Sequence, residues 1–195
     1  MNPVFNRNLF FVKEHYGMFK AANNYDILDP KTQEVILHCR EDNMSFITKM
    51  LRFSDYKRMT PFEVTISLPD GQRLFTVKRG WTFWRSVVEV LDGKGDLVGT
   101  FRQRMMSIGG KFDLLGPDGN QLCTLRGKWT SWDFSFEHEH EILARVTKKW
   151  AGLGKELFTT ADNYMLTIEP VVPPDRSIRM MVMAAVMCID MVLKE

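Results

Sequence analysis

The stretch RSIRMMVMAAVMCIDMVLKE, residues 176–195, is the most hydrophobic segment of this chain, and its environment decides the fold. Its uninterrupted apolar run covers ten residues, 180–189. A bilayer core needs about 20 apolar residues, and shorter runs are more often buried core helices. A longer span would draw Arg179 and Asp190 into the hydrocarbon, which is costly. The pattern favours a buried core helix at about residues 176–193 and leaves a membrane-spanning or anchoring helix as the alternative.

A helix over residues 176–193 would be apolar on every side, so other parts of the chain must enclose it. Flexible methionine side chains suit the filling of an irregular interior. Asp190 stands near the expected C-terminus of the helix, where an acid opposes the helix dipole. Its side chain either reaches the open end of the structure that surrounds the helix or provides a polar contact for a lipid headgroup. The residues that we assign to this central helix include Met180, Met183, Ala184, Met187 and Asp190.

The composition is that of an ordinary globular protein from a reducing compartment. An apolar content of 45% in 195 residues suits one domain, residues 1–195. The net charge of +2 argues against charge-driven binding of nucleic acid, so we expect no nucleic-acid partner. Cys39, Cys123 and Cys188 form no CxxC pair, and the N-terminus lacks the long apolar stretch of a secretory signal. We therefore expect a cytoplasmic protein.

Most of the chain before the helix follows a strand–turn–strand pattern. Four segments place two β-rich runs around a turn that carries Asp with Gly or Pro, residues that favour turn geometry. Asp70-Gly71, Asp92-Gly93 and Asp118-Gly119 are the strongest hairpin signals. The four segments are YDILDPKTQEVILHC (25–39), FEVTISLPDGQRLFTV (62–77), SVVEVLDGKGDLVGTF (86–101) and KFDLLGPDGNQLCTL (111–125).

Further strands are predicted at residues 8–14, 133–139, 142–148 and 164–169. The stretch MSFITKMLRFSDYKR (44–58) instead suits a short amphipathic helix or an irregular crossover. A strand-rich chain that ends in one wholly apolar helix has an economical solution. The sheet closes into a barrel, which removes its edges, and the helix fills the interior. We therefore predict a mainly β fold, a closed antiparallel barrel around a hydrophobic C-terminal helix.

The segment KKWAGLGKELFTTADNYMLTIEP, residues 148–170, together with the terminal helix resembles the phospholipid scramblase family. The residues that match in the family's order and spacing are Lys149, Trp150, Gly152, Glu156, Phe158, Thr159, Ala161, Asp162, Asn163, Tyr164, Ile189 and Asp190. That family belongs with the tubby-like proteins, so the resemblance implies a twelve-stranded barrel around a buried C-terminal helix. It also implies a protein that acts at membrane phospholipids.

The resemblance maps the family's calcium segment onto residues 160–171. Calcium takes about six to eight oxygen ligands, several of them carboxylates. Thr160 and Val171 stand where the family has acids, which leaves Asp162 as the carboxylate in place. We expect no cofactor and, at most, weak calcium binding; a turn with local side-chain hydrogen bonds is the favoured reading of residues 159–163. The positions of this degenerate segment are Thr160, Asp162, Tyr164, Leu166, Ile168 and Val171.

Basic residues beside aromatic ones form the candidate ligand surface. Arginine and lysine suit phosphate, and tryptophan suits the depth of lipid headgroups. Tubby-like barrels bind phosphoinositide headgroups through basic surface residues, so the resemblance implies phospholipids or anionic headgroups as partners. The alternative is that these residues form ordinary solvated strand faces and barrel-wall aromatics without a lipid ligand. A protein partner is a separate candidate. The candidates are Lys78, Arg79, Arg85, Arg102, Arg104, Lys148 and Lys149, near Trp81, Phe83, Trp84 and Trp150.

No enzyme site can be assembled from the sequence. FEHEHEI (136–142) would place His138 and His140 on one face of a strand, but zinc needs a third protein ligand and none is evident. We predict no metal site there and read the stretch as a solvated strand end or hairpin tip. The cysteines and histidines give no nucleophile with an activating base. We predict no hydrolytic or redox activity and, at most, scramblase-type lipid translocation.

The predicted function is that of a scramblase-family protein that binds membrane-lipid headgroups, peripheral to the membrane. Movement of lipids between leaflets is the further activity that the family name implies. The alternative is a soluble tubby-like binding or scaffold module without lipid transport. The two differ in whether the chain engages the bilayer or offers only the surface of a sealed barrel, and fold alone does not decide between them.

Overall fold

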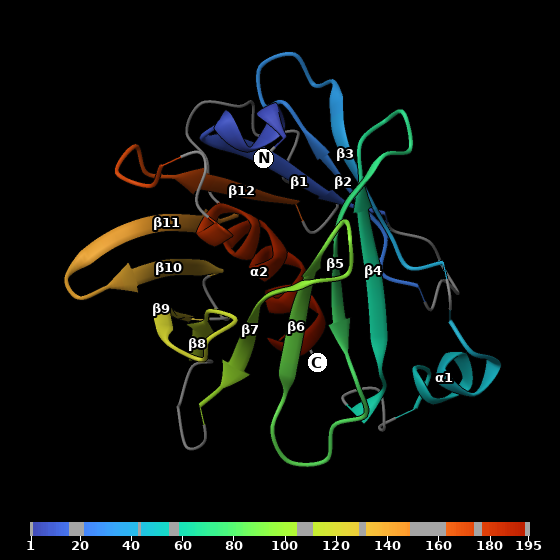
Figure 1. Cartoon of the computed structure of the whole chain (residues 1–195). Coiled ribbons are helices and arrows are strands. Elements are labelled where there is room, and N and C mark those ends of the chain that lie inside the picture. The colour runs from blue at the N-terminus through green and yellow to red at the C-terminus, as the bar shows by residue number, and fades with distance from the viewer. Residues whose placement is uncertain are drawn as a thin grey trace.

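The computed structural model of the chain describes residues 2–15, 22–42, 44–54, 59–104, 111–128, 132–148, 163–173 and 177–193. Within these ranges, twelve antiparallel strands close into a barrel, and helix α2 (Ser177–Leu193) runs through its interior (Figure 1). A shorter helix, α1 (Phe46–Leu51), lies outside the barrel in the connection between two strands. The predicted mainly β fold, a closed barrel around a C-terminal helix, is therefore confirmed.

Each strand pairs with its neighbours in the chain, and β1 closes the barrel by pairing with β12. The strands predicted at residues 8–14, 133–139, 142–148 and 164–169 all appear, with bounds within one residue of the expectation. The elements are η1 (Pro3–Asn6), β1 (Leu9–Glu14), β2 (Tyr25–Leu28), β3 (Val35–Arg40), β4 (Phe62–Ser67), β5 (Arg73–Arg79), β6 (Val87–Asp92), β7 (Leu97–Gln103), β8 (Phe112–Leu115), β9 (Gln121–Lys128), β10 (Asp133–His138), β11 (Glu141–Thr147) and β12 (Asn163–Ile168), besides the two α-helices.

The four predicted hairpins are present, and three of their turns show why the sequence forms them. In each, an aspartate side chain accepts the backbone N–H two residues ahead, at 2.9 Å for Asp70, 2.8 Å for Asp92 and 3.0 Å for Asp118. In the turn that begins at Asp92, the glycine with left-handed backbone is Gly95, with φ 95°. Each turn is thus closed by its own side chains, which specifies the pairing of its strands locally.

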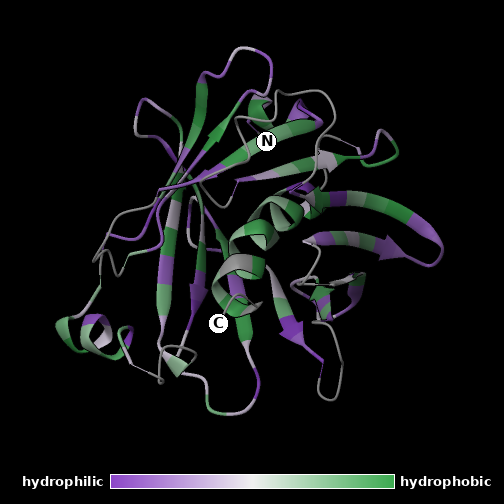
Figure 2. Cartoon of the chain, turned by 180° about the vertical axis from the view of Figure 1, so that it is seen from behind, coloured by the Kyte–Doolittle hydropathy of each residue, from purple (hydrophilic) through white to green (hydrophobic). Residues whose placement is uncertain are grey.

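The interior of the barrel is filled by α2 and by the inward side chains of the strands. The burial of β4 alternates along the strand, with Phe62, Val64 and Ile66 facing inward. On α2, Met181, Ala184 and Ala185 have no exposed surface. The view coloured by hydropathy places this apolar helix among the strands (Figure 2). The helix that is apolar on every side is therefore enclosed by the sheet.

Helix α2 approaches β7 closely at Gly99. A Cβ atom built on Gly99 would lie 2.4 Å from the carbonyl oxygen of Leu115 and 2.9 Å from Cε of Met181. Both distances are shorter than van der Waals contact, so a side chain at this position would push against the sheet and the helix together. Glycine is therefore required here by the close packing of the interior.

Arg179, the charged residue near the start of α2, is buried, and each nitrogen of its guanidinium donates a hydrogen bond. It is 2% exposed, and its guanidinium donates to the carbonyl oxygens of Val172, Pro173, Phe5 and Arg7 and to a side-chain oxygen of Asn8. These acceptors belong to both ends of the chain. Burial lowers the pKa of the guanidinium below its usual range. Arg179 thus ties the start of α2 to the N-terminal segment and to the connection that follows β12.

Candidate functional site

Three basic side chains of the predicted set lie around the beginning of β6. Lys78 lies on β5 and Arg102 on β7, on either side of β6, and Arg102 is directly opposite Val87 in the register of the sheet. Arg85 precedes β6, and its Nε donates to the carbonyl oxygen of Gln103 at 2.8 Å. All three basic side chains are exposed. We call Lys78, Arg85 and Arg102 the basic triad.

Two further arginines of the predicted set are differently placed. Arg79 is 4% exposed, and its guanidinium donates to the carbonyl oxygen of Thr60 at 2.7 Å and lies 4.8 Å from the ring centre of Phe62. Arg104 donates through Nε to both carboxylate oxygens of Asp113, at 2.8 and 2.9 Å, and this hydrogen bonding raises its pKa. Arg79 is therefore part of the barrel wall, contrary to its expected place on the surface, and Arg104 carries a charge that Asp113 already compensates.

The second predicted basic group is separated from the triad. Lys148 is half-buried, and its ammonium lies 4.2 Å from the ring centre of Trp132 and 5.5 Å from that of Tyr164. A cation over two aromatic faces is stabilised by the rings and covers them from solvent. Lys149 and Trp150 lie outside the described residues. The structure therefore gives Lys148 a packing role on the barrel.

The loop between β5 and β6 exposes the aromatic side chains that the sequence places beside the basic residues. Trp81 is 52% exposed, Phe83 is 71% exposed and Trp84 is 92% exposed. We call residues 80–86 the aromatic loop. Since this loop leads into β6, its aromatic side chains stand next to the basic triad. This juxtaposition joins two kinds of group that suit a lipid headgroup layer.

Sequence reasoning missed a second exposed apolar group, which lies on α1 and, at Phe53, on the turn that follows it. Phe46 is 74% exposed, Ile47 and Phe53 are each 64% exposed, and Met50 is 61% exposed. The signal was present, because Phe46, Met50 and Phe53 are spaced four and three residues apart and so share one side of a helix. Such a stripe usually faces a protein core. Here it faces solvent.

The calcium-like segment falls partly outside the described residues, which do not include Thr160 and Asp162. Tyr164, Leu166 and Ile168 are buried in β12, each 1% exposed or less, and Val171 is 54% exposed. The three buried side chains pack in the core, and none of them carries a carboxylate. Among the described residues, no group of three or more His, Cys, Asp and Glu side chains is placed to hold a metal ion.

The residues assigned to the central helix are buried where their side chains are described. Met180 is 8% exposed, Met183 and Met187 are each 1% exposed, and Ala184 has no exposed surface. The side chain of Asp190 lies outside the described part of the helix. In the part of the chain that the structure describes, we find no helix with the length and apolar character needed to cross a bilayer.

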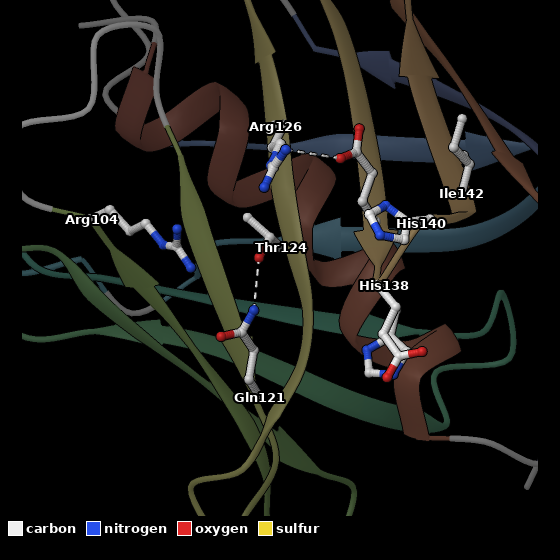
Figure 3. A pocket seen from close by; sticks show the side chains of 9 residues that line it. Arg104, Gln121, Thr124, Arg126, His138, His140 and Ile142 are labelled. Atoms are coloured by element: carbon white, nitrogen blue, oxygen red, sulfur yellow. Dashed lines mark hydrogen bonds and ion pairs between the residues drawn. The ribbon is translucent and has the colours of Figure 1, made fainter.

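A polar hollow of about 460 Å³ lies on the outer wall of the barrel beside the hairpin of β10 and β11 (Figure 3). His138 and His140 both line it. β10 ends at His138, and Glu139 has a left-handed backbone with φ 50°, so the chain turns there instead of continuing the strand on which the alternation of side chains was predicted. The interpretation as a hairpin tip is therefore confirmed.

The charges around this hollow are mixed. Arg126 lies 3.4 Å from a carboxylate oxygen of Glu137, and Gln121 donates to the hydroxyl of Thr124 at 2.8 Å (Figure 3). The hollow also contains Arg104, whose charge is compensated by Asp113. Two pairs of its polar groups therefore bond with each other, and its lining carries both arginines and glutamates without an excess of one charge that would select a ligand.

The scramblase family model matches residues 12–195 of this chain. The match covers nearly the whole sequence, including the hairpins that carry no motif of their own. The chain therefore belongs to the scramblase family, which confirms the resemblance found in residues 148–170 and in the terminal helix.

A curated relative is the "Altered inheritance rate of mitochondria protein 25" of Saccharomyces cerevisiae (strain ATCC 204508 / S288c). It is 25% identical over 191 residues, and the alignment covers 85% of this chain. The chain spans 58% of the length of that relative. No solved structure matches the chain significantly.

Proposed function

We propose that this scramblase-family protein binds the headgroups of anionic phospholipids, peripherally, through the basic triad. The observation that carries the proposal is the exposure of Lys78, Arg85 and Arg102 around the beginning of one strand, beside exposed aromatic side chains. Arginine and lysine donate charge-assisted hydrogen bonds to phosphate oxygens. The family of the chain supports phospholipids as the class of ligand.

The charges in and around the basic triad determine how strongly we expect it to bind anionic lipid. Each basic residue near an anionic membrane surface contributes about 1 kcal/mol, so three contribute about 3 kcal/mol. Glu63 and Glu89 lie opposite Lys78 in the two neighbouring strands and reduce the positive potential there. Binding should therefore be weak for an isolated headgroup and stronger for a surface that presents many. It should also weaken as the salt concentration rises.

The position of α2 favours binding at the membrane surface over movement of lipid through the barrel. The helix is buried, and the guanidinium of Arg179 fastens its beginning to Phe5 and Val172. Exposure of this helix to a bilayer would break those hydrogen bonds. We therefore propose headgroup binding as the primary function and leave transport between leaflets outside the proposal. We likewise propose no hydrolytic or redox activity.

The test is flotation of the purified protein on vesicles of neutral phosphatidylcholine with and without phosphatidylserine. The variant replaces Lys78, Arg85 and Arg102 by Gln, and the matched control removes the same charge at the exposed residues Lys13, Lys31 and Lys94. We expect the wild type and the control to float with anionic vesicles. The triad variant should remain unbound.

Retention of binding by the triad variant would contradict this assignment of the site. Absence of flotation by the wild type on any vesicle would favour the alternative, a binding or scaffold module whose partner is a protein.

A further inference from the structure

Helix α1 and the aromatic loop lie at the same end of the barrel in both views (Figures 1 and 2). The short segment at residues 59–61 joins them. The amide of Thr82 in the loop donates to the carbonyl oxygen of Met59 at 3.2 Å, and Arg52, directly after α1, donates to that of Pro61 at 2.9 Å. We define the apolar end as the exposed side chains of these two segments: Phe46, Ile47, Met50, Phe53, Trp81, Phe83 and Trp84.

The orientation of α1 is fixed by buried contacts at its C-terminal end. Two nitrogens of the Arg52 guanidinium donate to the two carboxylate oxygens of Glu41, both at 2.6 Å. Asn23 donates its backbone N–H and its side-chain amide to the same carboxylate, at 2.9 and 3.0 Å. Thr48 is 5% exposed and marks the side of the helix that faces the protein. The apolar side of α1 is therefore held outward by the fold.

The apolar end carries a positive rim. Lys49 is exposed on α1, Lys78 precedes the aromatic loop, and Arg85 lies within the loop, directly after Trp84. An exposed apolar group with polar surroundings marks an interaction site. Tryptophan and phenylalanine favour the interfacial layer of a bilayer, and lysine and arginine are attracted to anionic lipids. The chemistry of the rim therefore complements a negatively charged lipid surface.

We propose that the apolar end inserts into the headgroup layer of an anionic bilayer while the basic triad binds the surrounding phosphates. This inference rests on the proposed function and extends it, because it states how the barrel is oriented on the membrane. Stable membrane attachment usually needs two signals, and the apolar end supplies a second one beside the charges. The barrel then stands on α1 and the aromatic loop, with α2 still enclosed.

The first test compares the vesicle affinity of variants by flotation. Phe83→Ser with Trp84→Ser alters the aromatic loop, Ile47→Ser with Met50→Ser alters α1, and Leu97→Ser is the control. Leu97 is 40% exposed, at the opposite end of β7 from Arg102. Since these side chains lie outside the core, all variants should melt close to the wild type. We expect the affinity of each double variant for anionic vesicles to fall by about tenfold or more. The control should bind as the wild type does.

The second test measures insertion directly. Cys39, Cys123 and Cys188 are buried, and burial raises the pKa of Cys123 to about 12 and raises the pKa of the other two further, so a new exposed thiol will be labelled selectively. An environment-sensitive dye is attached to Phe83→Cys or, as control, to Leu97→Cys. On anionic vesicles the dye at position 83 should shift to the blue and be quenched by brominated acyl chains. The dye at position 97 should do neither.

The outcomes separate this inference from the proposed function. If the wild type floats but the dye at position 83 stays in water and both double variants bind normally, insertion is wrong and headgroup binding stands. If the dye inserts while the triad variant still binds, insertion stands and the assignment of the triad is wrong. If the wild type does not float, both are wrong, and the apolar end is then better explained as a contact for a protein.

Discussion

Arg52 and Glu41 form a buried ion pair beneath α1, with two nitrogen–oxygen distances of 2.6 Å and side chains that are 5% and 3% exposed. The pair joins a short external helix to the end of β3. Its burial makes it sensitive to the loss of Arg52, because the buried carboxylate of Glu41 would then lose its ion-pair partner.

We therefore expect Arg52→Met to lower the free energy of unfolding by about 3–5 kcal/mol. The matched double variant Arg52→Met with Glu41→Met removes both charges and should recover most of that loss, since two apolar side chains can replace a buried pair. Urea unfolding followed by circular dichroism measures both. A single variant as stable as the wild type would show that the pair does not hold α1.

A second prediction concerns the hydrogen bonds by which Arg179 joins the start of α2 to the N-terminal segment and to Val172. Arg179→Met removes the donor to the carbonyl oxygens of Phe5, Arg7 and Val172, and the hydrogen bonds to Phe5 and Val172 are buried. Each unsatisfied buried acceptor costs about 1–3 kcal/mol, so we expect a loss of about 3 kcal/mol or more. Thermal unfolding provides the measurement. Arg179→Lys is the control for charge alone, and because an ammonium cannot reach all the acceptors, it should recover only part of the stability.

Gly99 tests the packing of α2 against the sheet. Gly99→Ala places a methyl group against Leu115 and Met181 and should destabilise the protein by about 1–3 kcal/mol. Gly80→Ala is the matched control, because a Cβ atom at Gly80 meets nothing within 4 Å. Equal melting temperatures for the two variants would contradict the position of the helix inside the barrel.

Asp26 makes the stability of the folded chain depend on pH in the acid range. Burial raises the pKa of Asp26, but hydrogen bonds with His38, Arg40 and His15 outweigh it, so the pKa lies below the usual value of 3.8. The stabilisation is therefore present above about pH 3.8 and is lost as the pH falls through the lowered pKa of the folded state. Asp26→Asn should cost about 1 kcal/mol at neutral pH, and the difference from the wild type should shrink below pH 3.8. If the difference in the free energy of unfolding between the two proteins stayed constant across that pH range, the ionised carboxylate of Asp26 would not be the source of the stabilisation.

The fold could be predicted from the sequence because its signals are local. Asp70, Asp92 and Asp118 mark turns that their own side chains close, and the apolar stretch of residues 177–193 demands enclosure on every side. Closure of the barrel between β1 and β12 rests on pairing across nearly the whole chain, which no local pattern encodes. We predicted closure because a closed barrel both removes the sheet edges and encloses the apolar helix, and because the family resemblance implies it.

The candidate site could be predicted only in part. The triad lies in a short stretch of sequence, so its residues could be found, but the direction of each side chain could not. Arg79 follows Lys78 by one residue and is buried where Lys78 is exposed, because successive side chains of a strand point to opposite faces. The outward stripe of α1 was missed because a helical apolar stripe normally faces a core, and its orientation depends on Glu41 in another element.

The central claim is that this scramblase-family protein binds anionic membranes through the barrel end beside β6. The most direct test is the partitioning of the wild type between buffer and vesicles with increasing fractions of phosphatidylserine, in the presence of a calcium chelator and at several salt concentrations. We predict partitioning that rises steeply with the anionic fraction, falls with salt and needs no calcium. Absence of partitioning at every lipid composition, or partitioning that appears only with calcium, would contradict the account.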